Sequence, residues 1–346
     1  MKRLLVFLIL LSLTVLPALS EEEEAQPVTI SLTCVGDCTL GGVANHTASS
    51  EKMFARAVDK NGYEWFLEKV RYLFEADDFT LINLEGPLTT ATEYEEKASF
   101  YFRGRPSDVQ ILTCSSVEVA TLANNHSHNF RQAGYDETVK TLEEAGVGVC
   151  GYEQVYYASC KNITVGFAGF DQWLSDDEQI RRVLTEARKN CDLLIVSYHG
   201  GIENSYGVSE SVRHAGRLCI DLGADLVVGN HSHVFSGLEL YKGKYIIGSL
   251  GNFLFGGNTN PKDLTCTIFR QSFTVYPNGR IEDAGIDIIP ASVSSVKGSN
   301  NCQPCVMENE HYALKHFNSV MRLSSFKAKD IKWLEDSFAV SHGLDK

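Results

Sequence analysis

Polar side chains that bind divalent metals or transfer protons follow five apolar, strand-like segments of this chain. The segments break off at such residues, as in ISLTCVGD, FTLINLE and DLLIVSYH. The residues concerned are Asp37, Glu85, Asn125, His126, His199, His231 and His233. Because the carboxyl ends of strands in an open α/β sheet converge on one crevice, residues far apart in the sequence can meet there. A single carboxylate or histidine is usually structural, but this repeated pattern predicts one shared site.

The order of strand and helix signals predicts sheets covered by helices. Apolar alternation or continuous apolar runs predict strands at 28–34, 79–85, 117–122, 163–170, 193–197 and 225–228. Helical spacing predicts helices at 53–74, 135–145, 176–190, 209–222, 311–325 and 329–338. From residue 238 onward, hairpin signals with Gly turns replace the alternation of strand and helix. This order predicts an α/β protein with one mixed sheet or two packed sheets, and with helices outside.

The N-terminal segment has the features of a secretory signal peptide. Lys2 and Arg3 precede an apolar run at 4–16, and small residues follow at Ala18 and Ser20. We therefore predict a signal peptide at 1–20, a main domain at 26–292, and a C-terminal helical extension at 293–346. The protein is expected to be secreted or extracytoplasmic. The alternative is an uncleaved N-terminal segment, which would anchor the protein at the cell surface and be its one membrane contact.

The charge of the chain restricts its partners. The formal net charge is −13, and loss of the two positive residues Lys2 and Arg3 with the signal would make it −15. An acidic chain without a basic tract is a poor ligand for nucleic acid, so we expect no such partner. The chain also repels anionic substrates unless local cations reverse the field at the site. Bound metal ions would do so.

The cysteines and sequons are consistent with an extracytoplasmic protein. Ten cysteines follow the signal segment, and an oxidising compartment would pair some of them in disulfides. Cys302 and Cys305 form the one close pair, and no second Cys-x-x-Cys completes a zinc site. A disulfide in a surface segment is therefore favoured there over a metal or redox motif. The sequons at Asn45 and Asn162 make the chain a candidate glycoprotein if its source is eukaryotic.

The residues at the strand ends match the ligands of a centre for one or two divalent ions, such as Mn, Zn, Fe or Mg. Ligand atoms lie about 2 Å from such an ion, and hydrolytic centres leave one position open for water. Two ions about 3.5–4 Å apart share one ligand, commonly a carboxylate, and Glu85 is predicted to be that bridge. The other predicted ligands are Asp37 on the first ion, Asn125 and His199 on the second, and His231 and His233 on different ions.

Three further residues are predicted to act around the ions. His126 is adjacent to Asn125, so it would face the substrate, where it could donate a proton or hold an anionic oxygen. Asn124 and Glu203 are predicted to orient ligands or contact substrate. Each residue also has a structural interpretation, such as a turn cap at Asp37 or helix caps at Asn124 and Asn125. Their combination favours the metal centre.

Several of these segments resemble the CapA family of capsule and poly-γ-glutamate synthesis proteins, which are similar to calcineurin-like metallophosphatases. The matching segments are VGDCTLGG at 35–42, NLEGPLT at 83–89, TLANNHSHNFRQAG at 121–134, SYHGGIE at 197–203 and the long segment 223–255. The resemblance implies a four-layer αββα sandwich of two mixed sheets, with the metal ligands assigned above. It also implies that Asn252 lies near the site.

The chain departs from the family pattern in three places. Metallophosphatases usually carry Asp-x-His on the first strand, whereas 37–39 reads Asp-Cys-Thr, so one ligand of the first ion is missing, as in the CapA family generally. The family commonly has His-Trp-Gly where 199–201 reads His-Gly-Gly, which removes an aromatic wall. The family usually has Gly-His-His-Pro-His where 229–233 reads Gly-Asn-His-Ser-His, which keeps the two required histidines.

Two functions are consistent with these features. The first is a secreted metal-dependent hydrolase that acts on a phosphoester or on a γ-glutamyl, polyglutamate-type anionic polymer. The second is a non-enzymatic factor for the binding, assembly or export of an anionic capsule-type polymer, which the missing ligand favours. A third interpretation is a purely structural extracellular module without a metal.

Overall fold

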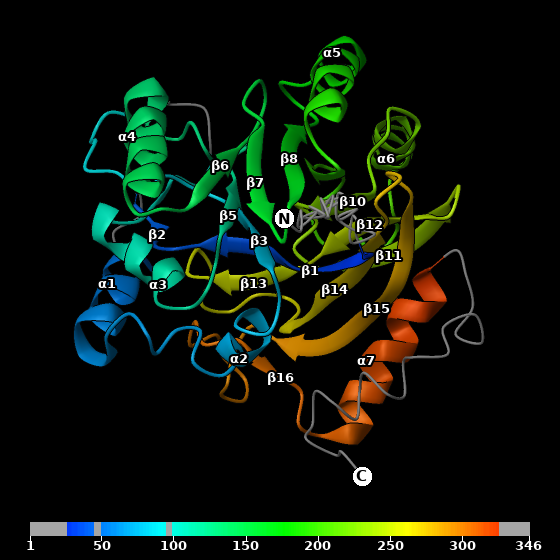
Figure 1. The fold of residues 1–346 in the computed structure, drawn as a ribbon. Coiled ribbons are helices and arrows are strands. Elements are labelled where there is room, and N and C mark those ends of the chain that lie inside the picture. The colour runs from blue at the N-terminus through cyan, green and yellow to red at the C-terminus, as the bar shows by residue number, and fades with distance from the viewer. Residues whose placement is uncertain (1–25, 45–49, 95–98, 325–346) are drawn as a thin grey trace, which may run out of the picture.

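Two mixed β-sheets pack face to face, and helices cover their outer faces (Figure 1). The computed structural model describes residues 26–44, 50–94 and 99–324. The predicted signal peptide at 1–20 and the predicted helix at 329–338 lie outside the described residues, as does the sequon at Asn45. None of the helices in the described ranges has both the length and the apolar character that a membrane span requires.

The first sheet has the order β16-β15-β14-β1-β3-β5-β6, and β13 also pairs with β1. The pairs β1–β3, β3–β5, β5–β6 and β1–β13 are parallel, and those among β1, β14, β15 and β16 are antiparallel. Its strands are β1 (Val28–Thr39), β3 (Phe79–Leu84), β5 (Val119–Thr121), β6 (Gly148–Cys150), β13 (Asn252–Phe255), β14 (Thr265–Val275), β15 (Ile281–Ser292) and β16 (Cys305–Val306).

The second sheet has the order β11-β12-β10-β9-β8-β7. Its central strands are parallel, and both edge strands are antiparallel to their neighbours. Its strands are β7 (Tyr156–Cys160), β8 (Ile163–Asp171), β9 (Leu193–His199), β10 (Leu226–Asn230), β11 (Phe235–Tyr241) and β12 (Lys244–Leu250). A separate two-stranded ribbon pairs β2 (Gly42–Val43) with β4 (Phe102–Arg103).

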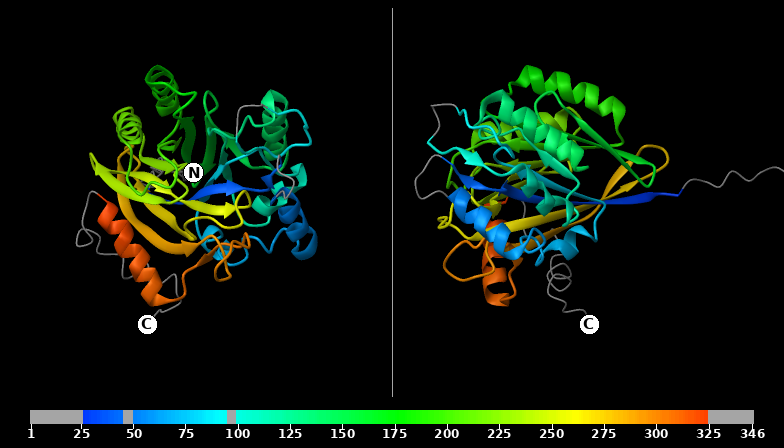
Figure 2. Two further views of the ribbon diagram at one scale, coloured as in Figure 1. Left: turned by 180° about the vertical axis from the view of Figure 1, so that it is seen from behind. Right: turned by 90° about the vertical axis from the view of Figure 1, so that its left-hand side faces the viewer.

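Helices lie outside both sheets, as the rotated views of Figure 2 also show. The first sheet is covered by α1 (Ser50–Asn61), α2 (Arg71–Phe74), α3 (Gln110–Thr113), which follows the 3₁₀ turn η1 (Pro106–Val109), and α4 (Arg131–Glu144). The second is covered by α5 (Asp177–Ala187), which continues into η2 (Arg188–Asn190), and α6 (Glu210–Asp221). Polar caps begin these last two helices, because the Asp176 side chain accepts from Gln179 N and that of Ser209 from Val212 N.

Strand β9 shows how the sequence builds the layers. Leu193 and Ile195 pack between the two sheets, whereas the alternate residues Leu194 and Val196 pack against α5 and α6. A continuous apolar run is therefore buried on both faces, as in a parallel sheet covered by helices. With a third apolar layer under α1 to α4, this arrangement confirms the four-layer αββα sandwich of two mixed sheets.

One predicted helix is wrong. The segment 53–74 was expected to be continuous, but α1 ends at Asn61 and α2 begins only at Arg71. Gly62 has a φ of +81°, the left-handed conformation with which helices commonly end. The apolar residues that follow, including Phe66 and Val70, are buried in turns. Their spacing reflects burial rather than one helix.

The C-terminal part of the described chain packs on both sheets. Strand β16 pairs with β15, and α7 (Glu310–Leu323) lies against β11 and β15 on the side of the molecule opposite α5 (Figure 1). The helix expected at 311–325 is thus present. The division into a domain at 26–292 and an extension at 293–346 stays a prediction.

All ten cysteines lie among the described residues, and none of them forms a disulfide there. The pairing expected for an oxidising compartment is therefore not seen. Cys34 and Cys219 are fully buried in apolar clusters, where they pack as small hydrophobic residues. The sequon at Asn162 lies among the described residues and is exposed. Its glycosylation stays a prediction.

Two acids with raised pKa values lie at the amino ends of β3 and β5. The carboxylate of Glu118 accepts a hydrogen bond from Thr80 N at 2.7 Å, and that of Asp77 accepts one from Thr80 Oγ1 at 2.9 Å. Burial raises the pKa of Asp77 to about 6, and burial with the nearby Asp77 charge raises the pKa of Glu118 to about 7. The folded protein therefore keeps protons that the unfolded chain loses.

Glu118→Gln is expected to stabilise the protein at pH 8 and to leave its stability nearly unchanged at pH 4. An unfolded glutamate loses its proton near pH 4.3, so the stability that Glu118 contributes falls as the pH rises from there through 7. Glutamine can still accept from Thr80 N. We expect a gain of about 1–2 kcal/mol in the free energy of unfolding at pH 8, measured by urea titration. Exposed Glu68→Gln is the control, and an equal change at both pH values would contradict the prediction.

Candidate metal centre

The structure brings the predicted site residues together at the carboxyl ends of the strands. Parallel pairing aligns Asp37 of β1 with both Asn83 of β3 and Asn252 of β13, and it aligns His199 of β9 with Asn230 of β10. The side chains of Asp37, Glu85 and His233 each offer a ligand atom, and these atoms lie within 4.8 Å of one another. Residues almost 200 positions apart in the sequence thus face one point.

Glu85 is the most informative residue of this cluster. It is completely buried, and neither of its carboxylate oxygens has a hydrogen-bond partner within the part of the chain that the structure describes. Nε2 of His126 and Nε2 of His233 each lie 3.8 Å from Oε1. Burial and the charge of Asp37 raise the pKa of Glu85 well above its usual range. A buried carboxylate without partners is costly unless a cation binds it.

Asp37 connects the two sheets. Its Oδ1 accepts from Asn83 Nδ2 at 2.8 Å, and its Oδ2 accepts from His233 Nδ1 at 3.1 Å. The backbone N–H of His231 donates to both oxygens, at 3.3 and 3.2 Å. Burial raises the pKa of Asp37, but the hydrogen bond and charge of His233 outweigh burial and lower it. The Asp37 carboxylate therefore positions other candidate metal ligands and is itself a candidate ligand.

His233 presents one nitrogen to the centre. Asn252 Nδ2 donates to the carbonyl oxygen of His233 at 3.3 Å, so Asn252 Oδ1 accepts from His233 Nδ1 at 2.9 Å. Nδ1 thus carries a proton, and Nε2 faces Glu85. Burial lowers the pKa of His233, but the charges of Glu85 and Asp37 raise it to about 10. A metal ion at Nε2 would displace a proton.

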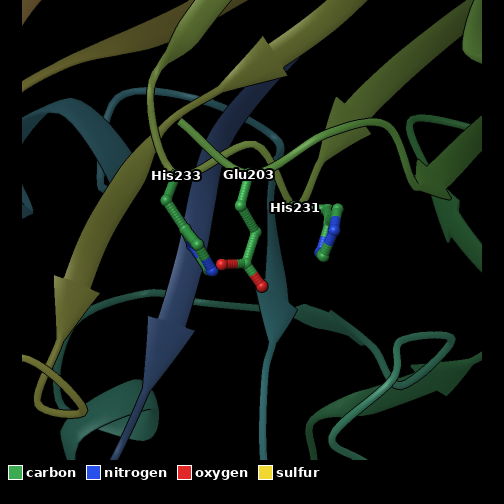
Figure 3. Close-up of side chains that lie close together, drawn as sticks. All are labelled: Glu203, His231 and His233. Carbon is green, nitrogen blue, oxygen red and sulfur yellow. The ribbon is translucent and has the colours of Figure 1, made fainter. Parts of the chain in front are cut away.

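The turn that carries the two histidines has an unusual backbone. His231 has a φ of +94° and His233 a φ of +57°, both in the left-handed region that favours glycine. Such conformations cost about 1–3 kcal/mol each and persist where the surroundings impose them. Ser232 Oγ donates to Val234 O at 2.6 Å, which helps to fix the turn. This turn places the rings of His231 and His233 near the carboxylate of Glu203 (Figure 3).

His199 and Asn125 contact each other on the second sheet's side of the centre. His199 Nε2 lies 2.9 Å from Asn125 Oδ1, and His199 Nδ1 lies 3.9 Å from Asp37 Oδ1. Burial lowers the pKa of His199 well below its usual range, so the ring is neutral. Neutral imidazole is the form that binds metal ions. The ring nitrogen and amide oxygen are close enough to bind one ion together.

Asn83 is a functional candidate that our sequence interpretation missed. Backbone groups fix the orientation of Asn124, whose Nδ2 donates to Leu84 O and whose Oδ1 accepts from His126 N. The same Nδ2 donates to Asn83 Oδ1 at 3.1 Å, so Asn83 Nδ2 faces Asp37 and lies 3.1 Å from His199 Nδ1. One buried amide thus holds two predicted ligands. A polar residue two positions before Glu85, inside an apolar strand, was the available signal.

His126 lies over the centre as a neutral base. Asn129 Oδ1 accepts from Phe102 N at 2.8 Å, so it also accepts from His126 Nδ1 at 2.9 Å. The unprotonated Nε2 then faces Glu85. Burial lowers the pKa of His126 to about 4. At neutral pH this ring can accept a proton at Nε2, and it must first accept one before it can donate one to a leaving group.

The expected loss of an aromatic wall at residue 200 is compensated in the structure. The Trp173 ring lies 4.8 Å from that of His231 and 6.0 Å from that of His199, measured between centroids. A Cβ on Gly200 would lie 3.1 Å from Gln172 Oε1 and 2.9 Å from the Tyr198 ring. The loop that carries Trp173 therefore occupies the space beside residue 200, and the aromatic surface comes from that loop instead.

A cleft of about 320 Å³ opens above the centre. Its lining includes His126, Glu203, His233 and Asn252, together with Phe100 and Lys262. A larger cavity of about 760 Å³ lies beside α7 and contains none of the predicted site residues. Of these two cavities, the smaller cleft is thus the one that borders predicted site residues.

These residues fit a divalent metal ion. Two buried carboxylates, one of them without partners, face the neutral rings of His199 and His231, and Nδ1 of His231 is likewise buried without a partner. Burial and the charge of His233 lower the pKa of His231. Carboxylates with neutral imidazoles are the ligand set of catalytic zinc and related sites. The fold and the site together define an αββα sandwich protein with a candidate metal centre at its strand ends.

Comparison with known proteins assigns the family. Residues 31–257 match the family described as bacterial capsule synthesis protein PGA_cap, and the chain belongs to this family. It is 25% identical to the PGA biosynthesis protein CapA of Bacillus subtilis (strain 168) over 293 residues, which cover 78% of this chain and 74% of that protein. It is 24% identical to the capsule biosynthesis protein CapA of Bacillus anthracis, covering 76% and 67%. The predicted CapA resemblance is confirmed.

Two solved structures match most of the length of this chain. A hypothetical protein from Thermus thermophilus matches 75% of this chain and 98% of its own, with a TM-score of 0.48 and 13% identity. A novel phosphatase from Mycoplasma pneumoniae matches 85% of this chain and 100% of its own, with a TM-score of 0.47 and 13% identity.

Proposed function

We propose that this protein is a secreted, metal-dependent hydrolase that acts on an anionic substrate, either a phosphoester or a γ-glutamyl bond of a polyglutamate-type polymer. The observation that carries the proposal is Glu85, a fully buried carboxylate with two unpartnered oxygens beneath an open cleft. The relatives' names, PGA biosynthesis and capsule biosynthesis, support the polymer as the context of this activity.

The side chains have separate roles in this proposal. Asp37, Glu85 and His233 would hold one divalent ion. Glu85, Asn125, His199 and His231 are the predicted ligands of a second. When bound, such ions polarise the reacting group and lower the pKa of water. Nε2 of His126 accepts a proton over the centre, and Trp173 shields the histidines from solvent on one side. Asn83 and Asn252 orient the ligands through their amide groups.

The second candidate is a non-enzymatic factor that binds an anionic polymer during its assembly or export. Thr39 supports it, because this residue stands where a further ligand of the first ion was expected. Its Oγ1 accepts from Gly257 N at 2.8 Å, so the side chain holds a loop instead of facing an ion. The first ion then has fewer protein ligands than a metallophosphatase supplies.

Metal content and turnover separate the two candidates. The full chain is expected to retain a divalent ion on purification and to hydrolyse bis(p-nitrophenyl) phosphate or poly-γ-glutamate after addition of Mn²⁺ or Zn²⁺, with loss of turnover in EDTA. Metal analysis and product release measure this result. Protein that stays metal-free and shows no turnover on any of these substrates would contradict the hydrolase. Polyglutamate binding that survives His126→Ala and His199→Ala without hydrolysis would establish the binding factor.

A further inference from the structure

Glu203 lies beside the histidine turn, in a loop that neighbouring hydrogen bonds hold in place. Asn204, which has a φ of +59°, donates its backbone N–H to Ser232 O at 2.7 Å. Gly201 N donates to Gln172 Oε1 at 2.9 Å, which fixes the start of the same loop. Among the described residues, the Glu203 carboxylate makes no hydrogen bond or ion pair. The loop therefore places a free anion at the turn rather than a structural contact.

Three donor atoms gather at this point. Glu203, His231 and His233 each offer one, and the three atoms lie within 4.8 Å of one another (Figure 3). Two ligands of one ion lie up to about 4.2 Å apart when each bond is about 2.1 Å long, so only small adjustments are needed. His231 is 95% buried, and its Nδ1 has no hydrogen-bond partner. That unpartnered ring is an independent sign that something binds there.

His233 has only one ring nitrogen available to bind a metal ion, so the donor atoms divide between two ion positions. Its Nδ1 donates to Asp37 and Asn252, so only Nε2 is available, and a single nitrogen binds one ion. With His233 assigned to the ion beside Glu85, the donors left on the solvent side are Glu203 and His231. We propose that Glu203, on the solvent side of His231, is a further ligand of the second ion, and that occupancy of this second position lets the centre bind an anionic substrate. This inference rests on the proposed metal centre.

Charge explains why the second position matters. Three carboxylates face the centre, those of Asp37, Glu85 and Glu203, in a chain whose net charge is −13. With one divalent ion, the net charge of the ion and the three carboxylates is still negative, whereas two divalent ions make it positive. Lys262 is exposed at the cleft and adds one positive charge at its wall. An anionic group is thus attracted to the floor of the cleft only after the second ion has bound.

Calorimetry of the full chain with Mn²⁺, followed by inorganic phosphate as the anionic probe, tests this inference. We expect two Mn²⁺ ions per wild-type chain. Glu203→Gln should keep the first with an affinity within about threefold and bind the second at least about tenfold more weakly. Its phosphate affinity in Mn²⁺ should fall by a similar factor. Because Glu203 makes no hydrogen bond or ion pair among the described residues, the melting temperature in EDTA should change little. Glu68→Gln, on an exposed surface, is the matched control and should behave as wild type.

The outcomes separate this inference from the function on which it rests. Two ions of unchanged affinity in Glu203→Gln would overturn the inference and leave the metal centre intact. A wild-type stoichiometry of one would do the same. Wild-type protein that binds no Mn²⁺ would overturn the metal centre itself, and the inference with it. Weakened Mn²⁺ binding with unchanged phosphate affinity would keep Glu203 as a ligand but reject the role of the second ion in substrate binding.

Discussion

Glu85→Gln is expected to abolish metal binding while it stabilises the protein in EDTA. The wild-type carboxylate is buried without a partner, and the neutral amide has the same shape without the cost of a buried charge. We expect the free energy of unfolding in EDTA at pH 8 to rise by about 1–3 kcal/mol. The pKa of Glu85 is raised, so the gain should shrink as the pH falls and the wild-type carboxyl takes up a proton.

The metal affinity should move in the opposite direction. Loss of a carboxylate from the centre is expected to weaken Mn²⁺ binding by about 100-fold or more, measured by calorimetry. Glu68→Gln removes an exposed carboxylate and should change neither quantity. Opposite signs for stability and binding are the signature of a residue kept for its ligand rather than for the fold. A variant that unfolds more easily in EDTA and still binds Mn²⁺ would show that Glu85 is structural.

Asn83→Ala is expected to weaken metal binding beyond what its loss of stability explains. The substitution removes hydrogen bonds to Asp37 and His199 and leaves the Asn124 amide without one acceptor. We expect a loss of about 2–4 kcal/mol in the free energy of unfolding. The ligands would also lose their orientation, so the affinity for Mn²⁺ should fall by about 10-fold to 100-fold.

A variant on the same strand provides the matched control. Leu81 is buried between the two sheets on β3, away from the centre, so Leu81→Ala should cost about 2–5 kcal/mol through the cavity it leaves. Its affinity for Mn²⁺ should stay near that of wild type. If both variants lose affinity to the same degree at matched stability, Asn83 supports the fold alone and has no positioning role.

Strand positions could be predicted from the sequence because burial leaves a direct pattern. The apolar run of β9 and the alternation at the start of β1 follow from a fixed repeat of two residues. The ends of these strands were then enough to bring Asp37, Glu85 and His199 to one edge. Helical spacing was less reliable, since the residues from Phe66 to Val70 are buried in turns with the same apolar content. A local pattern cannot distinguish one helix from a helix followed by packed turns.

Long-range pairing and hydrogen bonds explain what the sequence did not reveal. The family resemblance implied that Asn252 lies near the site, but no local signal predicts the parallel pairing of β13 with β1 that aligns Asn252 with Asp37. Trp173 lies beside the histidines because its own loop, through the neighbouring Gln172, fills the space next to Gly200. The role of Asn83 depends on the orientation of Asn124, which two backbone groups fix. The protonation of His126 depends likewise on Asn129, whose partners come from a distant strand.

The position of Asp37 has a consequence for the lifetime of the folded chain. This carboxylate joins β3 to the histidine turn, and so it fastens one half of the sandwich to the other. An ion bound beside it would strengthen this connection between the two sheets, and removal of the ion by a chelator would weaken it. Resistance to proteases would then depend on the concentration of divalent metal ions around the protein. An organism could shorten or extend the lifetime of the protein by controlling that concentration.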